Sequence, residues 1–368
     1  MKRIIALLLI LAVFLSTGTV AYASTASWQS SVESFYVMSE EVPKGVYDHI
    51  QESIAGITND LYDTQKILVS KPFKLFNPSF DLYYCLIYYN RKIVGTYRAF
   101  EIDGRYTGIF SENKEIIEGF ERISSLTTPE NPVKLISGNY DDIYALIGFD
   151  IYPILSDPSG NKTTIKAILA SSVTCASTHI TDITEGITVN QINTRSNPTS
   201  KYLQIGYAET QGSQPWCMAY VTASIMRYKT GNGISTISAQ SVMEWAYPGL
   251  TQTQLNSESL STTKADEFAN TYNIDPVYTA SRRTYSQIVN EIKADNPVAF
   301  ICDNLNTGAK KCHAFVCRGY NDYSGNSYYS IWNPWYTQFE RIYTSDNTYV
   351  NSSGTARYLW SATMYDWD

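Results

Sequence analysis

The sequence is short of positive charge, of histidine and of long apolar runs. Its 28 lysines and arginines are outnumbered by 35 aspartates and glutamates, which gives a formal net charge of −7. Nucleic acids and anionic membranes bind to basic faces, so we expect neither as a partner. Beyond the first two dozen residues, no apolar stretch approaches the ~20 residues that a membrane-spanning helix needs.

Cysteine is also sparse and widely spaced, at positions 85, 175, 217, 302, 312 and 317. This spacing lacks the density of a disulfide scaffold, although a cross-strand disulfide between Cys302 and Cys317 remains open. Cys312 and His313 are adjacent, so on a strand they would point to opposite faces. A zinc site needs more converging ligands than these, and we expect no metal and no other cofactor.

The start of the chain has the pattern of a secretory signal peptide. Lys2 and Arg3 precede an apolar run from residue 4 to residue 15, and Ala21-Tyr22-Ala23 has the small-x-small form of a cleavage site. The apolar run is too short to span a bilayer. We therefore expect residues 1–23 to be a signal peptide and the protein to be secreted and extracellular, with no membrane contact after cleavage.

Residues 24–170 are rich in aromatic, alternating runs, and the whole chain holds 30 tyrosines. Residues 80–89, a turn at 90–92 and residues 93–102 form the pattern of a β-hairpin, and Asp103-Gly104 indicates a second turn. An amphipathic stretch, 28–57, precedes them. This region is expected to be a mainly antiparallel β domain with a helix on it.

Residues 171–200 are rich in Ser, Thr and Asn, a composition typical of an exposed and cleavable linker. Residues 201–368 then form a further domain that begins with helices and ends with strands. Helices are predicted over 216–228, ended by Gly231-Asn232-Gly233, and after a capping box at 284–287. Strands are predicted at 298–302, 314–320, 328–332 and 357–365.

Cys217 has the local setting of a reactive thiol. It lies where the first helical pattern of this domain begins, directly after Pro215-Trp216. The free N–H groups at a helix N-terminus stabilise a thiolate. Gln211, six residues upstream, could donate its side-chain N–H to an oxyanion, with the Cys217 backbone N–H as the second donor.

A thiol nucleophile also needs a base held in one orientation. The chain has three histidines, and of these only His313 falls in the same predicted domain as Cys217. Twenty residues later, Asn333 follows a predicted strand and could orient the imidazole. Trp335 could cover that contact from water.

The order Gln211, Cys217, His313, Asn333, with Trp216 beside the cysteine and Trp335 after the asparagine, resembles papain-like cysteine peptidases, most closely the secreted bacterial staphopain type. The resemblance covers roughly residues 200–368. It implies an α+β fold with a helical subdomain carrying the nucleophile, a β-barrel-like sheet subdomain carrying the base, and a substrate cleft between them. It also implies that residues 24–170 are an inhibitory propeptide, released when the 171–200 linker is cut.

Two features depart from the plant-type pattern. The motif C-G-[SA]-C-[WY] is absent, since Gln214 stands where its first cysteine would be and Met218 follows Cys217. His313 follows Cys217 by 96 residues (313 − 217), against ~130–150 in papain. This shorter spacing fits the compact bacterial type.

The sequence therefore predicts a secreted cysteine endopeptidase made as a zymogen, acting through a Cys217 thiolate and a His313 imidazolium. Its expected partners are protein or peptide substrates and its own propeptide, and a dedicated protein inhibitor is left open. Two alternatives remain: a cell-wall amidase or transamidase using the same two residues, and a non-catalytic secreted binding protein on a papain-like fold.

Overall fold

The computed structural model describes residues 34–76, 80–174, 179–186, 199–323 and 326–368. The expected signal peptide, residues 1–23, lies outside this range. Among the described residues, no helix has both the length and the apolar character that crossing a membrane requires.

The first predicted hairpins are confirmed. Strands β4 (Leu82–Tyr89), β5 (Lys92–Ile102) and β6 (Arg105–Ser111) pair antiparallel in succession. The two residues of the first turn, Asn90 and Arg91, have φ of 49° and 69°, and those of the second, Asp103 and Gly104, have 50° and 76°. Two successive positive φ values match the twist of a tight hairpin.

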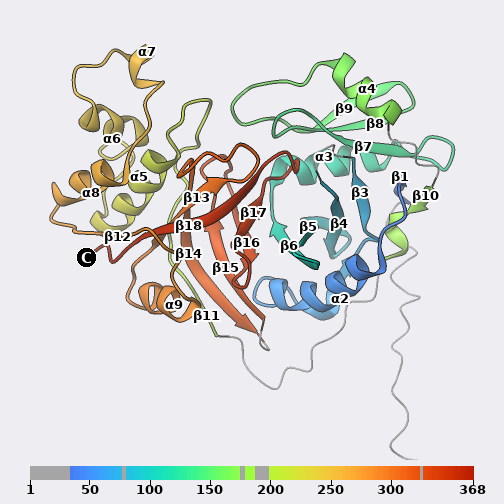
Figure 1. Ribbon diagram of the computed structural model, residues 1–368. Coiled ribbons are helices and arrows are strands. Elements are labelled where there is room, and N and C mark those ends of the chain that lie inside the picture. The colour runs from blue at the N-terminus through green and yellow to red at the C-terminus, as the bar shows by residue number, and fades with distance from the viewer. Residues whose placement is uncertain (1–33, 77–79, 175–178, 187–198, 324–325) are drawn as a thin grey trace, which may run out of the picture. The chain divides into compact units, whose positions relative to one another are not determined.

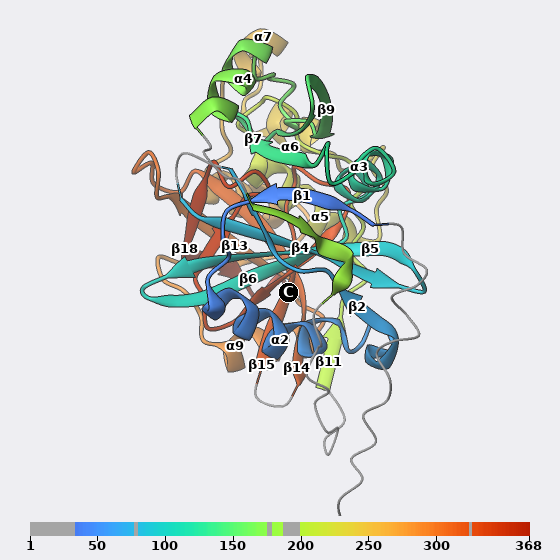
Figure 2. The same cartoon turned by 90° about the vertical axis from the view of Figure 1, so that its right-hand side faces the viewer.

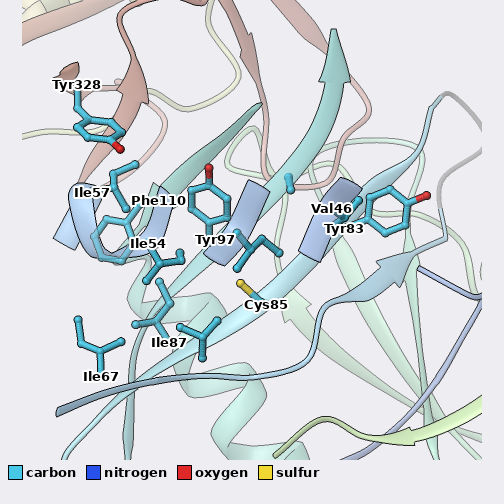
Figure 3. Close-up of a cluster of buried hydrophobic side chains, with 13 residues drawn as sticks. Val46, Ile54, Ile57, Ile67, Tyr83, Cys85, Ile87, Tyr97, Phe110 and Tyr328 are labelled. Atoms are coloured by element: carbon cyan, nitrogen blue, oxygen red, sulfur yellow. The ribbon is translucent and has the colours of Figure 1, made fainter. Parts of the chain in front are cut away.

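Helix α2 (Lys44–Thr58) packs on strands β4–β6, as Figure 2 shows. Its apolar side joins a buried cluster with strand residues such as Cys85 and Tyr97 (Figure 3). Tyr328, from the C-terminal part of the chain, belongs to the same cluster. The two halves of the sequence therefore share a hydrophobic core.

A second, smaller sheet has the strand order β10-β1-β7-β8-β9. Its strands are β1 (Tyr36–Ser39), β7 (Val133–Ser137), β8 (Ile143–Ile147), β9 (Asp150–Leu155) and β10 (His179–Asp182). Helix α3 (Lys114–Ser124) packs against β9. Its N-terminus is capped by the Asn113 side chain, which accepts hydrogen bonds from the backbone N–H groups of Glu115 and Ile116.

After strand β11 (Thr199–Tyr202), the C-terminal part continues with a group of helices that Figure 1 shows together on one side of the sheet. They are α5 (Cys217–Thr230), α6 (Ala239–Ala246), α7 (Gln252–Leu255) and α8 (Thr262–Asn270), followed later by α9 (Tyr285–Lys293). Helix α5 ends at Gly231, which has φ of 70°. Both predicted helices are confirmed, and so is the capping box of Thr284 and Gln287 at α9.

The predicted C-terminal strands are confirmed as well, with slightly longer bounds for three of them. They are β13 (Val298–Asn304), β14 (His313–Tyr323), β15 (Asn326–Trp332) and β18 (Arg357–Tyr365). The sequence analysis missed β11 (Thr199–Tyr202), β12 (Val277–Thr279), β16 (Phe339–Tyr343) and β17 (Thr348–Val350). Cys302 lies opposite His313, while Cys317 lies opposite Val298; both thiols are free, so the suggested disulfide does not form.

One large sheet joins the two parts of the chain. Strand β16 pairs antiparallel with β6, so that β12-β18-β13-β14-β15-β16 continues into β6-β5-β4-β2, where β2 is Ile67–Val69. Residues 33–368 form one compact unit. The fold is thus α+β with extensive antiparallel pairing, and its division into propeptide and papain-like subdomains stays a prediction.

The segment predicted as a linker, 171–200, includes the end of α4 (Ile165–Thr174), strand β10 and the first residues of β11. Residues 175–178 and 187–198 lie outside the described range. Strand β11 pairs with β14, with Thr199 opposite Asp322 and Tyr202 opposite Gly319. The chain is therefore already anchored in the C-terminal sheet from Thr199 onward.

Candidate active site

Cys217 is the first residue of helix α5, as the sequence predicts. Trp216 precedes it as the N-cap, with φ −103° and ψ 16°, and no side chain caps the helix. The N-terminal N–H groups of α5 are therefore left without a capping side chain beside the thiol. Trp216 is buried and donates its indole N–H to the carbonyl of Leu255 at 3.2 Å, which ties the start of α5 to α7.

The Cys217 thiol lies against the backbone on either side of His313. Its Sγ is 3.7 Å from the carbonyl oxygen of Cys312, and the backbone N–H of Ala314 is directed at it. Strand β14 begins at His313. The helix start and the strand start thus meet, although Cys217 and His313 are far apart in sequence.

His313 is enclosed by aromatic rings and one amide. Its Nε2 is 3.1 Å from Oδ1 of Asn333. The indole of Trp335 stacks on the imidazole, with ring centroids 4.0 Å apart and planes at 20°. Phe315 meets the imidazole edge-on at 4.7 Å, and Tyr358 lies at 5.1 Å. The imidazole is therefore held in one orientation.

In this structure, burial disfavours the charged forms of both candidate groups, the Cys217 thiolate and the His313 imidazolium. It raises the pKa of the Cys217 thiol to about 12, although the N–H groups of Met218 and Ala314 act in the opposite direction. Burial lowers the pKa of His313 to about 4, with the Asn333 hydrogen bond only partly offsetting it. At neutral pH the two groups are therefore a thiol and a neutral imidazole.

Gln211 is buried beside the segment that contains Asn333 and Pro334. Its backbone N–H donates to the carbonyl of Pro334 at 2.8 Å, next to Asn333. One proton of its Nε2 is given to the carbonyl of Gln214 at 2.6 Å. Since an amide nitrogen carries two protons, one donor remains for a further acceptor.

Residues 196–367 match the sequence model of a known family, Staphopain peptidase C47. This match supports a staphopain-type cysteine peptidase family for this part of the chain. No curated protein matches the chain.

The structure brings together most, but not all, of the residues predicted for the site. The structure brings His313, Asn333 and Trp335 into direct contact, and it sets Cys217 and Gln211 against the backbone next to them. Trp216 instead faces α7. Their catalytic roles stay predictions.

Several residues that contact this site were missed by the sequence analysis. Tyr349 accepts a hydrogen bond from Nδ2 of Asn333 at 3.1 Å, and Glu340 accepts one from the Tyr349 hydroxyl at 2.6 Å. Tyr358 lies beside His313. The sequence offered only a general excess of tyrosine, which does not single out any of these positions.

Cys312, which directly precedes β14, is exposed, whereas His313, the first residue of the strand, is buried. In the described part of the chain, no three Cys, His, Asp or Glu side chains cluster as metal ligands would.

Proposed function

We propose that this chain is a secreted cysteine endopeptidase made as an inactive precursor. The observation that carries the proposal is the meeting of the α5 N-terminus with His313. The Cys217 thiol lies against the backbone flanking an imidazole that Asn333 hydrogen-bonds and Trp335 covers. Family membership supports the peptidase activity, and the signal-like pattern of residues 1–23 supports secretion.

In the reaction, the Cys217 thiolate attacks the carbonyl carbon of a peptide bond while His313 is an imidazolium. The oxyanion is stabilised by the Cys217 backbone N–H and by the remaining Nε2 proton of Gln211. His313 then protonates the leaving amine, which leaves a thioester. Water, deprotonated by His313, hydrolyses the thioester and regenerates the thiol. Asn333 and Trp335 keep the imidazole aligned throughout.

Contacts from the N-terminal part support the precursor proposal. The carboxylate of Asp141 accepts hydrogen bonds from the Ser353 backbone N–H at 2.8 Å and from the Tyr336 hydroxyl. The Ser137 hydroxyl donates to the carbonyl of Ser353 at 2.7 Å. The segment held in this way leads into Tyr358, whose ring flanks His313.

A second set of contacts ties α2 to the C-terminal sheet. The guanidinium of Arg341 donates to the Ile57 carbonyl at 2.7 Å and pairs with the Asp60 carboxylate. The Tyr202 hydroxyl also donates to Asp60, at 2.6 Å. We propose that these contacts hold the site in its buried, neutral form, and that cleavage of the linker admits water and allows the ion pair to form.

The cut is proposed to fall between Ser171 and Gln204, and the pairing of β11 narrows this window. A cut before Thr199 leaves β11 in the C-terminal sheet, whereas a cut after Tyr202 would remove it. N-terminal sequencing of the processed protein should therefore find a first residue at or before Thr199. A first residue between 200 and 204 would contradict the narrowed window, and one outside 171–204 would contradict the proposal.

The test is to express residues 24–368 with and without Cys217→Ala, and to incubate both with casein and with a thiol-directed epoxide. We expect the wild type to convert to a species of about half the size, to digest casein and to be labelled. The variant should do none of these. Activity on purified cell walls but not on casein would favour an amidase or transamidase.

If neither protein cuts or is labelled after trypsin has cut the linker at Arg195, the binding-protein alternative replaces the peptidase proposal.

A further inference from the structure

Asn333 is completely buried, and each of its side-chain polar atoms is bonded. Oδ1 accepts from the backbone N–H of Trp335 at 3.1 Å and lies 3.1 Å from Nε2 of His313. Nδ2 donates to the hydroxyl of Tyr349 at 3.1 Å. The Asn333 amide is thus held by hydrogen bonds between the candidate base, His313, and Tyr349 of strand β17.

The hydrogen bonds continue from Tyr349 to a buried charge. The Tyr349 hydroxyl donates to Oε2 of Glu340, in β16, at 2.6 Å. Oε1 of Glu340 lies 2.9 Å from the Arg98 guanidinium, in β5, and both side chains have no exposed surface. The Glu340 carboxylate thus forms a fully buried ion pair with a guanidinium that is always charged.

An ionised carboxylate can only accept hydrogen bonds. This sets the donor and the acceptor of each hydrogen bond in the row of side chains that runs from Glu340 through Tyr349 and Asn333 to His313. Tyr349 must donate to Glu340, so its oxygen is left to accept from Nδ2 of Asn333. The amide then presents Oδ1 to His313. That oxygen accepts a hydrogen bond from Nε2–H, which leaves Nδ1 of the imidazole as the basic nitrogen.

We propose that Tyr349 and Glu340 are positioning residues, which fix the amide orientation of Asn333 and through it the Nε2-protonated tautomer of His313. This inference rests on the proposed function, in which His313 is the base. All the residues from Glu340 to His313 lie C-terminal to the linker, so cutting the linker removes none of them from the part that holds His313, while Arg98 lies on the other side of the cut.

The Tyr349→Phe substitution removes the hydroxyl and keeps the ring, so it tests the role of the hydroxyl alone. Phenylalanine keeps the ring contacts with Phe315, at 4.6 Å, and with Tyr358, at 6.4 Å. The matched control is Tyr329→Phe, another buried tyrosine of the same sheet, whose ring packs against Phe300 and Trp360. Both variants lose a buried hydroxyl, but only the first loses a contact with Asn333.

The first measurement is the pH profile of kcat/KM after trypsin cleavage of residues 24–368 at Arg195. For Tyr349→Phe we expect kcat to fall ~10- to 100-fold, the range seen when a partner that orients a functional imidazole is removed, with KM little changed. The alkaline limb should move to lower pH, because a misaligned amide stabilises the imidazolium less. Tyr329→Phe should leave the limb in place.

The combination with Asn333→Ala distinguishes positioning from packing. If Tyr349 acts through Asn333, adding Tyr349→Phe to Asn333→Ala causes little further loss of kcat. Full additivity of the two losses, or an unmoved alkaline limb in Tyr349→Phe, overturns the inference.

A second measurement does not depend on activity. The uncleaved Cys217→Ala chain carries three histidines, so ¹⁵N-histidine labelling resolves few signals, and His49→Gln and His179→Gln assign them. We expect His313 to be the Nε2-protonated tautomer at neutral pH, with the other tautomer appearing in Tyr349→Phe and in Glu340→Gln. The same tautomer in all three proteins overturns the inference, whereas a wild type that cleaves nothing contradicts only the proposed function.

Discussion

At the scale of single residues, the most consequential feature is the buried pair of Arg98 and Glu340. Arg98 also donates from Nε and from one terminal nitrogen to the carbonyl of Val350, at 3.1 and 3.0 Å. One side chain of the N-terminal part therefore forms an ion pair with a carboxylate, and hydrogen bonds with a backbone carbonyl, of the C-terminal part. Removing one partner of such a pair leaves an uncompensated buried charge, which is far more costly than losing an exposed pair.

Arg98→Met should therefore destabilise the precursor by ~3–5 kcal/mol, measured by urea unfolding in the Cys217→Ala background. Adding Glu340→Gln should restore part of the loss, because it removes the unpaired charge. Lys44→Met is the control, since its pair with Asp48 on α2 is exposed and contributes little. An equal loss in Arg98→Met and in the control would contradict this prediction.

At the scale of elements, helix α5 depends on how it ends as well as on how it begins. Its last turn closes with the N–H of Gly231 donating to the carbonyl of Arg227 at 3.0 Å, and Gly231 adopts a left-handed conformation. Only glycine takes this conformation without cost from a side chain. The end of α5 is thereby fixed, and with it the register of the helix that begins at Cys217.

Gly231→Ala should lower the free energy of unfolding by ~1 kcal/mol, purely through backbone strain, because a methyl group there meets no atom within 4 Å. Gly206→Ala is the matched control, since it also has open space but does not have a left-handed φ. Thermal unfolding of both variants checks this. A larger loss at Gly206 than at Gly231 would show that strain is not the cause.

At the scale of the whole molecule, burial lowers the pKa of two histidines, half-buried His49 and buried His313. His49, on α2, is bonded to the Tyr97 hydroxyl at 2.7 Å, and burial lowers its pKa to about 4. His313 has its pKa lowered to about 4 by the same cause. Both are neutral in the folded precursor well below the pH at which an unfolded chain protonates them.

The precursor should therefore lose stability as the pH falls from about 6.5 to about 4. In this window the unfolded state binds protons that the folded state does not, so the free energy of unfolding decreases by up to ~1.4 kcal/mol per pH unit for each histidine. Urea unfolding of the Cys217→Ala precursor across the window measures this slope.

His49→Gln should make the slope shallower by its own share. The exposed His179→Gln is the control, because it leaves His49 and His313 in place. A slope that is the same in His49→Gln as in the unsubstituted precursor would refute the prediction.

The sequence by itself determined the local elements and the candidate residues. Turn residues at 90–91 and 103–104, the glycine at 231 and the capping box at 284–287 act within a few residues, so their structural effect can be predicted from the chain alone. The order of Gln211, Cys217, His313 and Asn333 likewise indicated the family before any geometry was known.

Only the tertiary structure decided what surrounds those residues. Three contacts join segments that are distant in sequence: the pairing of β16 with β6, the contact of Arg98 with Glu340, and the link from Glu340 through Tyr349 to Asn333. Arg98 and Glu340, for example, are 242 residues apart (340 − 98). Alternation along a strand predicts which face is buried, but it carries no information about which strand will lie beside it. That choice depends on how all the apolar surfaces are buried together, which is a property of the folded chain.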